Sequence, residues 1–343
     1  MADVSQLDVV KLASYLESQI DGFKGPISAD KFPGGQSNPT FKITAESGVY
    51  VLRRQPPGKL LKSAHAVDRE YRVLAALADS DVPVAKVYHL CEDREVIGSM
   101  FYIMEYCDGN VHWDAQLAEV DNTTRGKMYD EMNRVLAALH SVDLTAAGLE
   151  DYGKPGNYFA RQLDRWTKQY RASELEKIDE MNQLIEWLEN NQPEDDGRVS
   201  LVHGDYRLDN VMFDKNNQNI IAVLDWELST LGHPYADLAY QCMQLRMPGA
   251  GDMKGLMGID RAALNIPSEE EYVAQYCERM GLASIPNWEF YIAFSYFRLA
   301  AIIQGVAKRA ADGNASNKKA AQMGAYVKPM AQFALDTIAK AKA

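Results

Sequence analysis

A short segment of the sequence combines the residue types that phosphoryl transfer requires. Asp205 follows a His-Gly pair, Asn210 comes five residues later, and Asp225 comes fifteen residues after Asn210. Phosphoryl transfer from a magnesium nucleotide needs a carboxylate that orients the attacking hydroxyl, and an amide and a carboxylate that hold the metal. Mg²⁺ prefers oxygen ligands and usually keeps several waters, so few protein ligands suffice. The spacing therefore predicts Asp205 as the catalytic residue, and Asn210 and Asp225 as ligands of Mg²⁺.

Apolar runs beside these residues predict the strands that position them. Residues 199–202 lead into the loop, residues 211–213 leave it, and residues 220–224 end just before Asp225. The polar residues between the last two runs are typical of a turn, so these runs are expected to form a hairpin.

The same polar residues also have ordinary structural interpretations. An isolated Asp or Asn after a strand often caps a turn, and only the combination of Asp205 with Asn210 and the later aspartate favours catalysis. His203 is expected to have a structural role. Arg207 fits either a contact with phosphate or a pair with a neighbouring charge, Asp209 fits a position that faces solvent, and the roles of both stay open.

A glycine-containing turn near the start of the chain is a candidate phosphate-binding loop. Gly34 and Gly35 permit close approach of a ligand to the backbone, because glycine has no Cβ. Exposed amides in such a turn can bind phosphate oxygens, and Ser37 and Asn38 add donors. A Gly-Gly pair alone usually marks only a hairpin turn.

Other residues of this N-terminal part are expected near a nucleotide. Arg53 and Arg54 end a predicted strand, whose alternation allows one of them to face the phosphates and to pair with Glu70 on the next helix. Glu105 and Cys107 follow an apolar strand at a predicted hinge, where backbone groups would bind adenine. An exposed helix charge is the ordinary interpretation of Glu70.

The sequence predicts an α+β protein with two lobes. Residues 1–106 contain an N-terminal helix, a small antiparallel sheet and one inserted helix, and would bind the nucleotide. Residues 107–343 are mainly helical and would carry the catalytic and acceptor-binding residues. The predicted helices of this second lobe cover residues 123–141, 158–170, 175–190, 236–245, 269–280, 288–311 and 315–340.

Composition and charge exclude some classes of function. The net charge of −12 argues against a nucleic-acid partner, which needs clustered Lys and Arg. The four cysteines are widely spaced, so neither a zinc site nor a disulfide framework is expected, and a cytoplasmic location is favoured. The apolar stretch of residues 291–307 includes Arg298 and predicts a buried core helix rather than a membrane span. No membrane partner is expected, and the oligomeric state is not predicted.

Several segments together resemble the aminoglycoside phosphotransferase family, which has the protein-kinase-like fold. The resemblance rests on GGQSNPTF, YVLRRQPPG, REYRVLAAL, FYIMEY, LAALHSVD, HGDYRLDNVMFD and LDWELSTLGHPYADLAY, which occur in family order over about residues 25–310. The chain is most similar to the branch that contains the kinase-like domain fused to some acyl-CoA dehydrogenases. Two features depart from the wider kinase pattern. The strand cation is arginine rather than lysine, by register Arg53, and the glycine turn lacks a G-x-G-x-x-G pattern.

The resemblance implies ATP and Mg²⁺ as cofactors and a small-molecule hydroxyl as the phosphate acceptor. It implies Asp205 as the catalytic aspartate, Asn210 and Asp225 as magnesium ligands, Glu70 as the partner of the strand cation, and Asp237 as a buried acid that braces the catalytic loop. The branch suggests a hydroxy acid or a hydroxyacyl-CoA as acceptor. An aminoglycoside or a choline-like alcohol is the alternative, and a regulatory nucleotide-binding module without activity is the alternative of another class.

Overall fold

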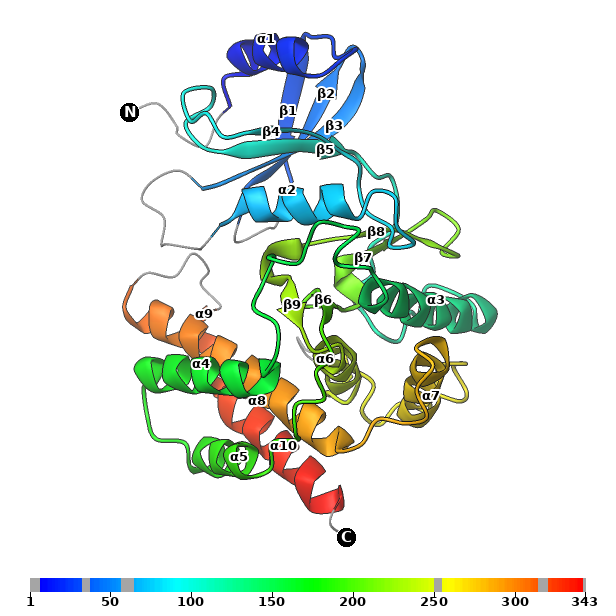
Figure 1. The fold of residues 1–343 in the computed structure, drawn as a ribbon, viewed down its shortest axis with the longest axis vertical. Helices are drawn as coiled ribbons and strands as arrows, with labels where there is room; N and C mark the ends of the chain where they lie inside the picture. Colours follow the sequence, from blue (N-terminus) through cyan, green and yellow to red (C-terminus); the bar gives the residue numbers. More distant parts are fainter. Residues whose placement is uncertain (1–6, 33–37, 57–64, 250–254, 314–319, 342–343) are drawn as a thin grey trace. The chain divides into compact units, whose positions relative to one another are not determined.

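The computed structural model of the 343-residue chain describes residues 7–32, 38–56, 65–249, 255–313 and 320–341 (Figure 1). The fold is α+β, as predicted, and has two compact units. Unit 1 comprises Met1–Val111, Thr145–Leu149 and Asn210–Leu228, and unit 2 comprises His112–Leu144, Glu150–Asp209 and Ser229–Ala343.

Unit 1 contains a five-stranded antiparallel sheet with the strand order β1-β2-β3-β5-β4. The elements are α1 (Val9–Gln19), β1 (Ile27–Lys31), β2 (Thr40–Ala45), β3 (Gly48–Arg54), α2 (Val67–Ala76), β4 (Val87–Cys91) and β5 (Phe101–Glu105). The alternation of strand side chains separates two faces of the sheet. Leu52, Phe101 and Ile103 pack with α1 in one core, whereas Tyr102 lies on the other face, where its ring contacts Tyr71 of α2.

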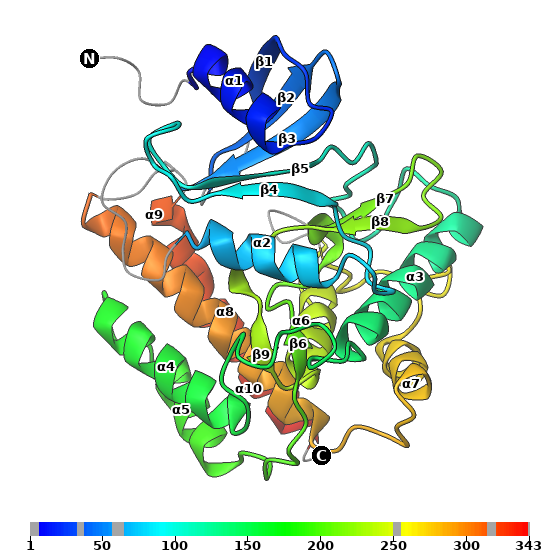
Figure 2. The same cartoon turned by 45° about the horizontal axis from the view of Figure 1, so that its top comes forward.

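A two-stranded hairpin also belongs to unit 1. Strands β7 (Val211–Phe213) and β8 (Ile220–Val223) pair antiparallel. Asn110 and Phe213 exchange two backbone hydrogen bonds of 2.8 Å. The Val223 amide donates to the carbonyl of Pro83, which follows α2. Figures 1 and 2 show the hairpin near one end of α2. A Cβ on Gly109 would lie 2.2 Å from the Phe213 carbonyl oxygen, so only glycine fits there.

These contacts explain two differences from the predicted division at residue 106. The first segment of unit 1 extends to Val111, because Asn110 pairs with the hairpin. The hairpin itself clusters with unit 1, although the sequence places it far into the part that we predicted as the second lobe. Pairing across more than 100 residues is not visible in local sequence patterns.

Unit 2 is built around the long helix α8 (Trp288–Ala311), with α4 (Tyr158–Ser173) and α10 (Val327–Ala341) against it (Figure 1). Among the described residues, α8 is the one helix long and apolar enough to cross a membrane, yet 83% of its most apolar window is buried. The prediction of a buried core helix is therefore confirmed. The other long helices of unit 2 are α3 (Asn122–His140), α5 (Asp179–Asn190), α6 (Tyr235–Leu245) and α7 (Glu269–Arg279).

Two elements of unit 2 differ from the sequence prediction. Strand β6 (Ser200–Val202) pairs antiparallel with a three-residue strand, β9 (Thr230–Gly232), which is too short to show alternation and was not predicted. The predicted helix of residues 315–340 is divided. Helix α9 (Ala320–Met323) and a 3-10 turn (Gly324–Tyr326) precede α10, and residues 315–319 lie outside the described part of the chain.

Candidate active site

Arg53 is the central cation of the site in unit 1. Its Nε lies 2.7 Å from Glu70 Oε2, and its Nη2 lies 2.8 Å from Asp225 Oδ1 and 3.9 Å from Glu227 Oε2. The planar guanidinium presents several donors in a fixed fork, so a single side chain can bind more than one carboxylate. The prediction that Arg53 pairs with Glu70 is confirmed.

Strand alternation explains why Arg53, and not Arg54, has this position. Arg53 pairs in register with Tyr102, whose side chain lies on the α2 face. Arg54 points to the opposite side, where its buried Nε donates to Ser99 Oγ at 2.9 Å. The register of the sheet therefore decides between the two arginines: Arg53, and not Arg54, pairs with Glu70.

Buried polar groups hold Glu70 in place. Only 2% of Glu70 is exposed. The amide of Asn38 donates to Glu70 Oε1 at 2.7 Å, and the Tyr102 hydroxyl donates to Oε2 at 3.3 Å. Asn38 Oδ1 in turn lies 3.0 Å from His65 Nδ1. Both oxygens of Glu70 are thus occupied, which fixes the carboxylate toward the guanidinium.

This cluster contains more negative than positive charge. Burial raises the pKa of Glu70 to about 7; Arg53 lowers it, whereas the charge of Asp225 adds to the rise. Burial alone would lower the pKa of Arg53, but the surrounding carboxylates outweigh burial and raise it, so Arg53 remains charged. Three carboxylates around one guanidinium leave a local excess of negative charge, which suits a site for a cation.

Asn210 and Asp225 lie at the same end of the β7–β8 hairpin. Val211 pairs with Val223, and the Leu224 amide donates to the Asn210 carbonyl at 2.8 Å. Asn210, just before β7, therefore lies beside the segment that leads from β8 to Asp225. Asp225 has a φ of +60°, a left-handed conformation that is uncommon outside glycine and is often found at functional sites. Its side chain is 41% exposed. An amide oxygen and a partly exposed carboxylate fit the oxygen ligands that Mg²⁺ prefers.

The other predicted nucleotide-binding residues have mixed outcomes. Gly34, Gly35 and Ser37 lie outside the described residues. The Asn38 side chain is fully buried and bonded to Glu70 and His65, so the structure favours a positioning role over the predicted contact with a cofactor.

The predicted hinge residues lie at the end of β5, of which Glu105 is the last residue. Glu105 has an exposed side chain, and its backbone amide donates to the Lys86 carbonyl at 2.7 Å, so this amide is already used within the protein. Burial and the charge of Glu105 raise the pKa of Cys107 to about 11. The Cys107 thiol is therefore neutral at physiological pH, and a contact of the backbone with adenine stays a prediction.

The loop that carries Asp205 lies in unit 2 and is braced by Asp237 on α6. The buried Asp237 carboxylate accepts the amide of His203 at 2.7 Å and that of Gly204 at 2.8 Å. Burial alone would raise the pKa of Asp237, but hydrogen bonding and charge from His140, together with the amide of Gly204, lower it. The role of Asp237 as a buried brace is confirmed. His203 Nδ1 accepts the Asp205 amide at 3.2 Å, in agreement with a structural role for His203.

Asp205 itself is partly exposed, with 23% of its side chain accessible. The Tyr240 hydroxyl donates to the Asp205 carboxylate; burial, then the charge of Asp205, raises the pKa of Tyr240. This bond orients the predicted catalytic carboxylate. Tyr240 was not singled out in the sequence, because a tyrosine on an apolar helix usually belongs to the core.

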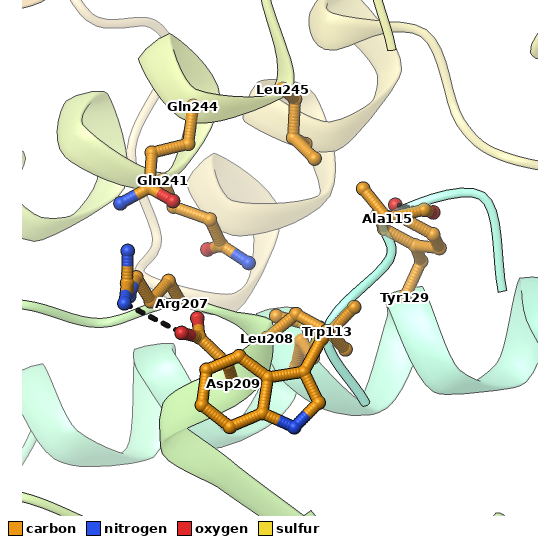
Figure 3. Close-up of a pocket in the computed structure, with 10 residues that line it drawn as sticks. Trp113, Ala115, Tyr129, Arg207, Leu208, Asp209, Gln241, Gln244 and Leu245 are labelled. Carbon is orange, nitrogen blue, oxygen red and sulfur yellow. Dashed lines mark hydrogen bonds and ion pairs between the residues drawn. The ribbon is translucent and has the colours of Figure 1, made fainter. Parts of the chain in front are cut away.

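A cavity of about 320 Å³ adjoins the residues that follow Asp205 (Figure 3). Arg207 and Asp209 line it and form an ion pair of 2.5 Å, which assigns a paired role to two residues whose roles the sequence left open. Gln241 and Gln244 of α6 also line the cavity. The sequence analysis did not select Gln241, although an amide within the apolar segment LAYQCMQL is a signal that could have identified it.

Comparisons with known proteins agree with this geometry. The sequence profile of the phosphotransferase enzyme family APH matches residues 28–276. The chain belongs to this family. A solved structure from Ralstonia eutropha, which has the provisional name of aminoglycoside phosphotransferase, is 48% identical. It covers 98% of this chain and 99% of its own chain, with a TM-score of 0.90.

Two further relatives of this phosphotransferase-family chain differ in kind. Mouse acyl-CoA dehydrogenase family member 10 is 47% identical over 92% of the chain. The chain spans 30% of the length of that protein, and less than half the length of the next curated relatives. A thermostable mutant of an aminoglycoside phosphotransferase, solved with AMP-PNP and hygromycin B, is 16% identical. It covers 95% of this chain and 98% of its own chain with a TM-score of 0.62, and it shows the protein-kinase-like fold.

Proposed function

We propose that this phosphotransferase-family protein transfers the γ-phosphate of ATP, with Mg²⁺, to a hydroxyl of a small molecule that is a hydroxy acid or a hydroxyacyl-CoA. The observation that carries the proposal is the arrangement around Arg53. One largely enclosed cation joins Glu70 of α2 to Asp225 at the end of the hairpin, where Asn210 would add a second oxygen ligand. The AMP-PNP bound to the aminoglycoside phosphotransferase supports ATP as donor.

The roles of the residues follow from their chemistry. Asp205 accepts the proton of the acceptor hydroxyl as its oxygen bonds to the γ-phosphorus, while the bond from phosphorus to the bridging oxygen breaks and ADP leaves. Arg53 binds phosphate oxygens, and Asn210 and Asp225 would hold Mg²⁺. When bound, Mg²⁺ supplies charge that offsets the negative charge on the phosphate oxygens.

The acceptor class is supported by the curated relatives. They are named as acyl-CoA dehydrogenases, and this chain matches only a part of each. A kinase-like segment in the same protein as an acyl-CoA dehydrogenase favours an acyl substrate. We also propose a cytoplasmic location, which the four free cysteines support.

Phosphate transfer from labelled ATP to hydroxy acids, hydroxyacyl-CoAs, choline-like alcohols and aminoglycosides tests the proposal. We expect transfer to the acyl compounds, with kcat lowered about 10²- to 10⁴-fold by Asp205→Asn and the nucleotide Kd unchanged. Asp108→Asn is a matched control, because Asp108 is an exposed partner of Lys215. Equal turnover in Asp205→Asn would exclude its catalytic role. Nucleotide binding without transfer to any compound would favour a regulatory module instead.

A further inference from the structure

The cavity beside Arg207 contains a buried hydrogen-bond donor without a partner. Gln241 is only 2% exposed, and its Oε1 accepts the Tyr272 hydroxyl at 3.0 Å. Among the described residues, nothing accepts a hydrogen bond from its Nε2, although this atom is buried. In Figure 3 the Gln241 amide points into the space between Trp113, Leu208 and Tyr129.

An unsatisfied buried amide donor is costly, roughly 1–3 kcal/mol, so such groups usually have a function or a missing partner. Because Tyr272 holds Oε1, the amide is oriented in advance and offers only its N–H groups to the cavity. The matching ligand group is an oxygen that accepts a hydrogen bond and needs no donor of its own to be satisfied. A carbonyl oxygen meets this condition, whereas a hydroxyl would also need an acceptor.

The rest of the wall indicates what surrounds that oxygen. Its apolar side chains include Trp113, which is 71% exposed, together with Met132 and Leu245. The charges of Arg207 and Asp209 offset each other in their ion pair. A polycation would find no unpaired carboxylate among these wall residues. The volume of about 320 Å³ lies at the lower end of the range for small-molecule sites.

We propose that the Gln241 amide binds an acyl oxygen of the acceptor molecule, and that this cavity selects an acyl-bearing hydroxyl compound over a polycationic one. The inference rests on the proposed function for its link to catalysis, since the cavity adjoins the residues that follow Asp205. It assigns the specificity for the acyl group to a particular residue of unit 2.

The test compares two neutral probes of equal chain length. One is a four-carbon hydroxyacyl thioester of N-acetylcysteamine, and the other is the corresponding hydroxyalkyl thioether, in which a CH2 group replaces the acyl carbonyl. Gln241→Leu keeps the volume and removes the donor. We expect it to raise the KM and the calorimetric Kd of the thioester about ten-fold, since a neutral hydrogen bond contributes about that factor, and to change those of the thioether less than about two-fold.

Two further variants sharpen the result. Gln241→Glu places an acceptor against the acyl oxygen, so we expect a larger loss for the thioester than in Gln241→Leu. Gln304→Leu is the control for loss of a buried glutamine, because Gln304 donates to the Ser173 carbonyl and does not line this cavity. It should leave both probes unchanged.

The outcomes separate this inference from the proposed function. An equal effect of Gln241→Leu on the two probes, or no effect, would overturn the role of Gln241. If Gln241→Leu does not fold, Tyr272→Phe is the deciding variant, because it removes the hydrogen bond that orients the Gln241 amide. It should weaken binding of the thioester more than binding of the other probe. An unchanged ratio of the two Kd values would overturn the proposal. If the unsubstituted chain phosphorylates no acceptor, phosphotransfer fails, while the calorimetric comparison still decides the binding role.

Discussion

Arg53 Nη2 lies 2.8 Å from Asp225 Oδ1, although the two residues are 172 positions apart in the chain. This ion pair joins the end of strand β3 to Asp225, the expected metal ligand, which follows β8. Because both residues belong to unit 1, the cation proposed to bind phosphate and the carboxylate proposed to bind the metal are built into one compact unit.

Removing this cation should destabilise the fold. Arg53→Met leaves the buried Glu70 carboxylate without its counterion, and we expect the free energy of unfolding to fall by about 3 kcal/mol. Glu70→Leu combined with Arg53→Met should recover much of that loss, because neither charge is then left buried alone. Urea denaturation of the two single variants and the double variant measures the coupling. Additive losses would show that the pair is not coupled.

Asp225→Ala should weaken the binding of the magnesium nucleotide. Without this carboxylate the hairpin end retains only the Asn210 amide of the predicted pair, so the increase in melting temperature caused by ATP with Mg²⁺ should shrink. Thermal shift with and without the metal measures the effect, with Asp108→Asn as the control. A metal-dependent shift equal to that of the unsubstituted chain would contradict the assignment.

Glu70 should give the stability a measurable pH dependence. Its pKa is raised from 4.5 to about 7, first by burial. The folded state therefore holds a proton that the unfolded state has lost between these values, so this contribution to stability is complete below pH 4.5 and disappears as the pH rises toward 7. The unsubstituted chain should lose about 3 kcal/mol relative to Glu70→Gln across this interval. Denaturation at a series of pH values checks the slope, and parallel curves would contradict it.

Asp237→Asn should disturb the loop that carries Asp205. The carboxylate accepts two backbone amides, and an asparagine retains only one acceptor oxygen while it directs a donor at the other amide. We expect a loss of about 2–3 kcal/mol in unfolding free energy and a lower kcat with a nearly unchanged nucleotide Kd. Asp336→Asn, on the exposed side of α10, is a suitable control. Unchanged kcat would show that the brace is not needed for turnover.

The sequence predicted those features that short-range patterns encode. The alternation of β3 showed that only one of Arg53 and Arg54 could face the site. The hydrophobic period gave α8 nearly residue for residue, and the spacing of Asp205, Asn210 and Asp225 identified the loop and hairpin. The role of Asp237 came from the resemblance, which also supported the pairing of Glu70 with the strand cation, and the structure supplied the contacts of both.

Features that depend on distant pairing were not predictable in this way. Strand β9 forms only because β6 lies beside it, and the hairpin joins unit 1 through Asn110. Asn38 is buried against Glu70 and His65. The sequence predicted it as a donor to a nucleotide, whereas in the structure it holds Glu70 in the ion pair with Arg53. Gln241 lies in an apolar segment that could have drawn attention to it, but its unsatisfied Nε2 is visible only in the structure.

The guanidinium at position 53 affects how this protein responds to covalent labelling. Acylating reagents react with a deprotonated amine, which a lysine can supply, whereas an arginine stays protonated. Burial alone would lower the pKa of Arg53, but the carboxylates around it raise this pKa and keep the guanidinium protonated. A nucleotide analogue whose acyl phosphate modifies a lysine at the equivalent strand position would leave Arg53 unmodified, so labelling at this position could not report nucleotide binding by the protein.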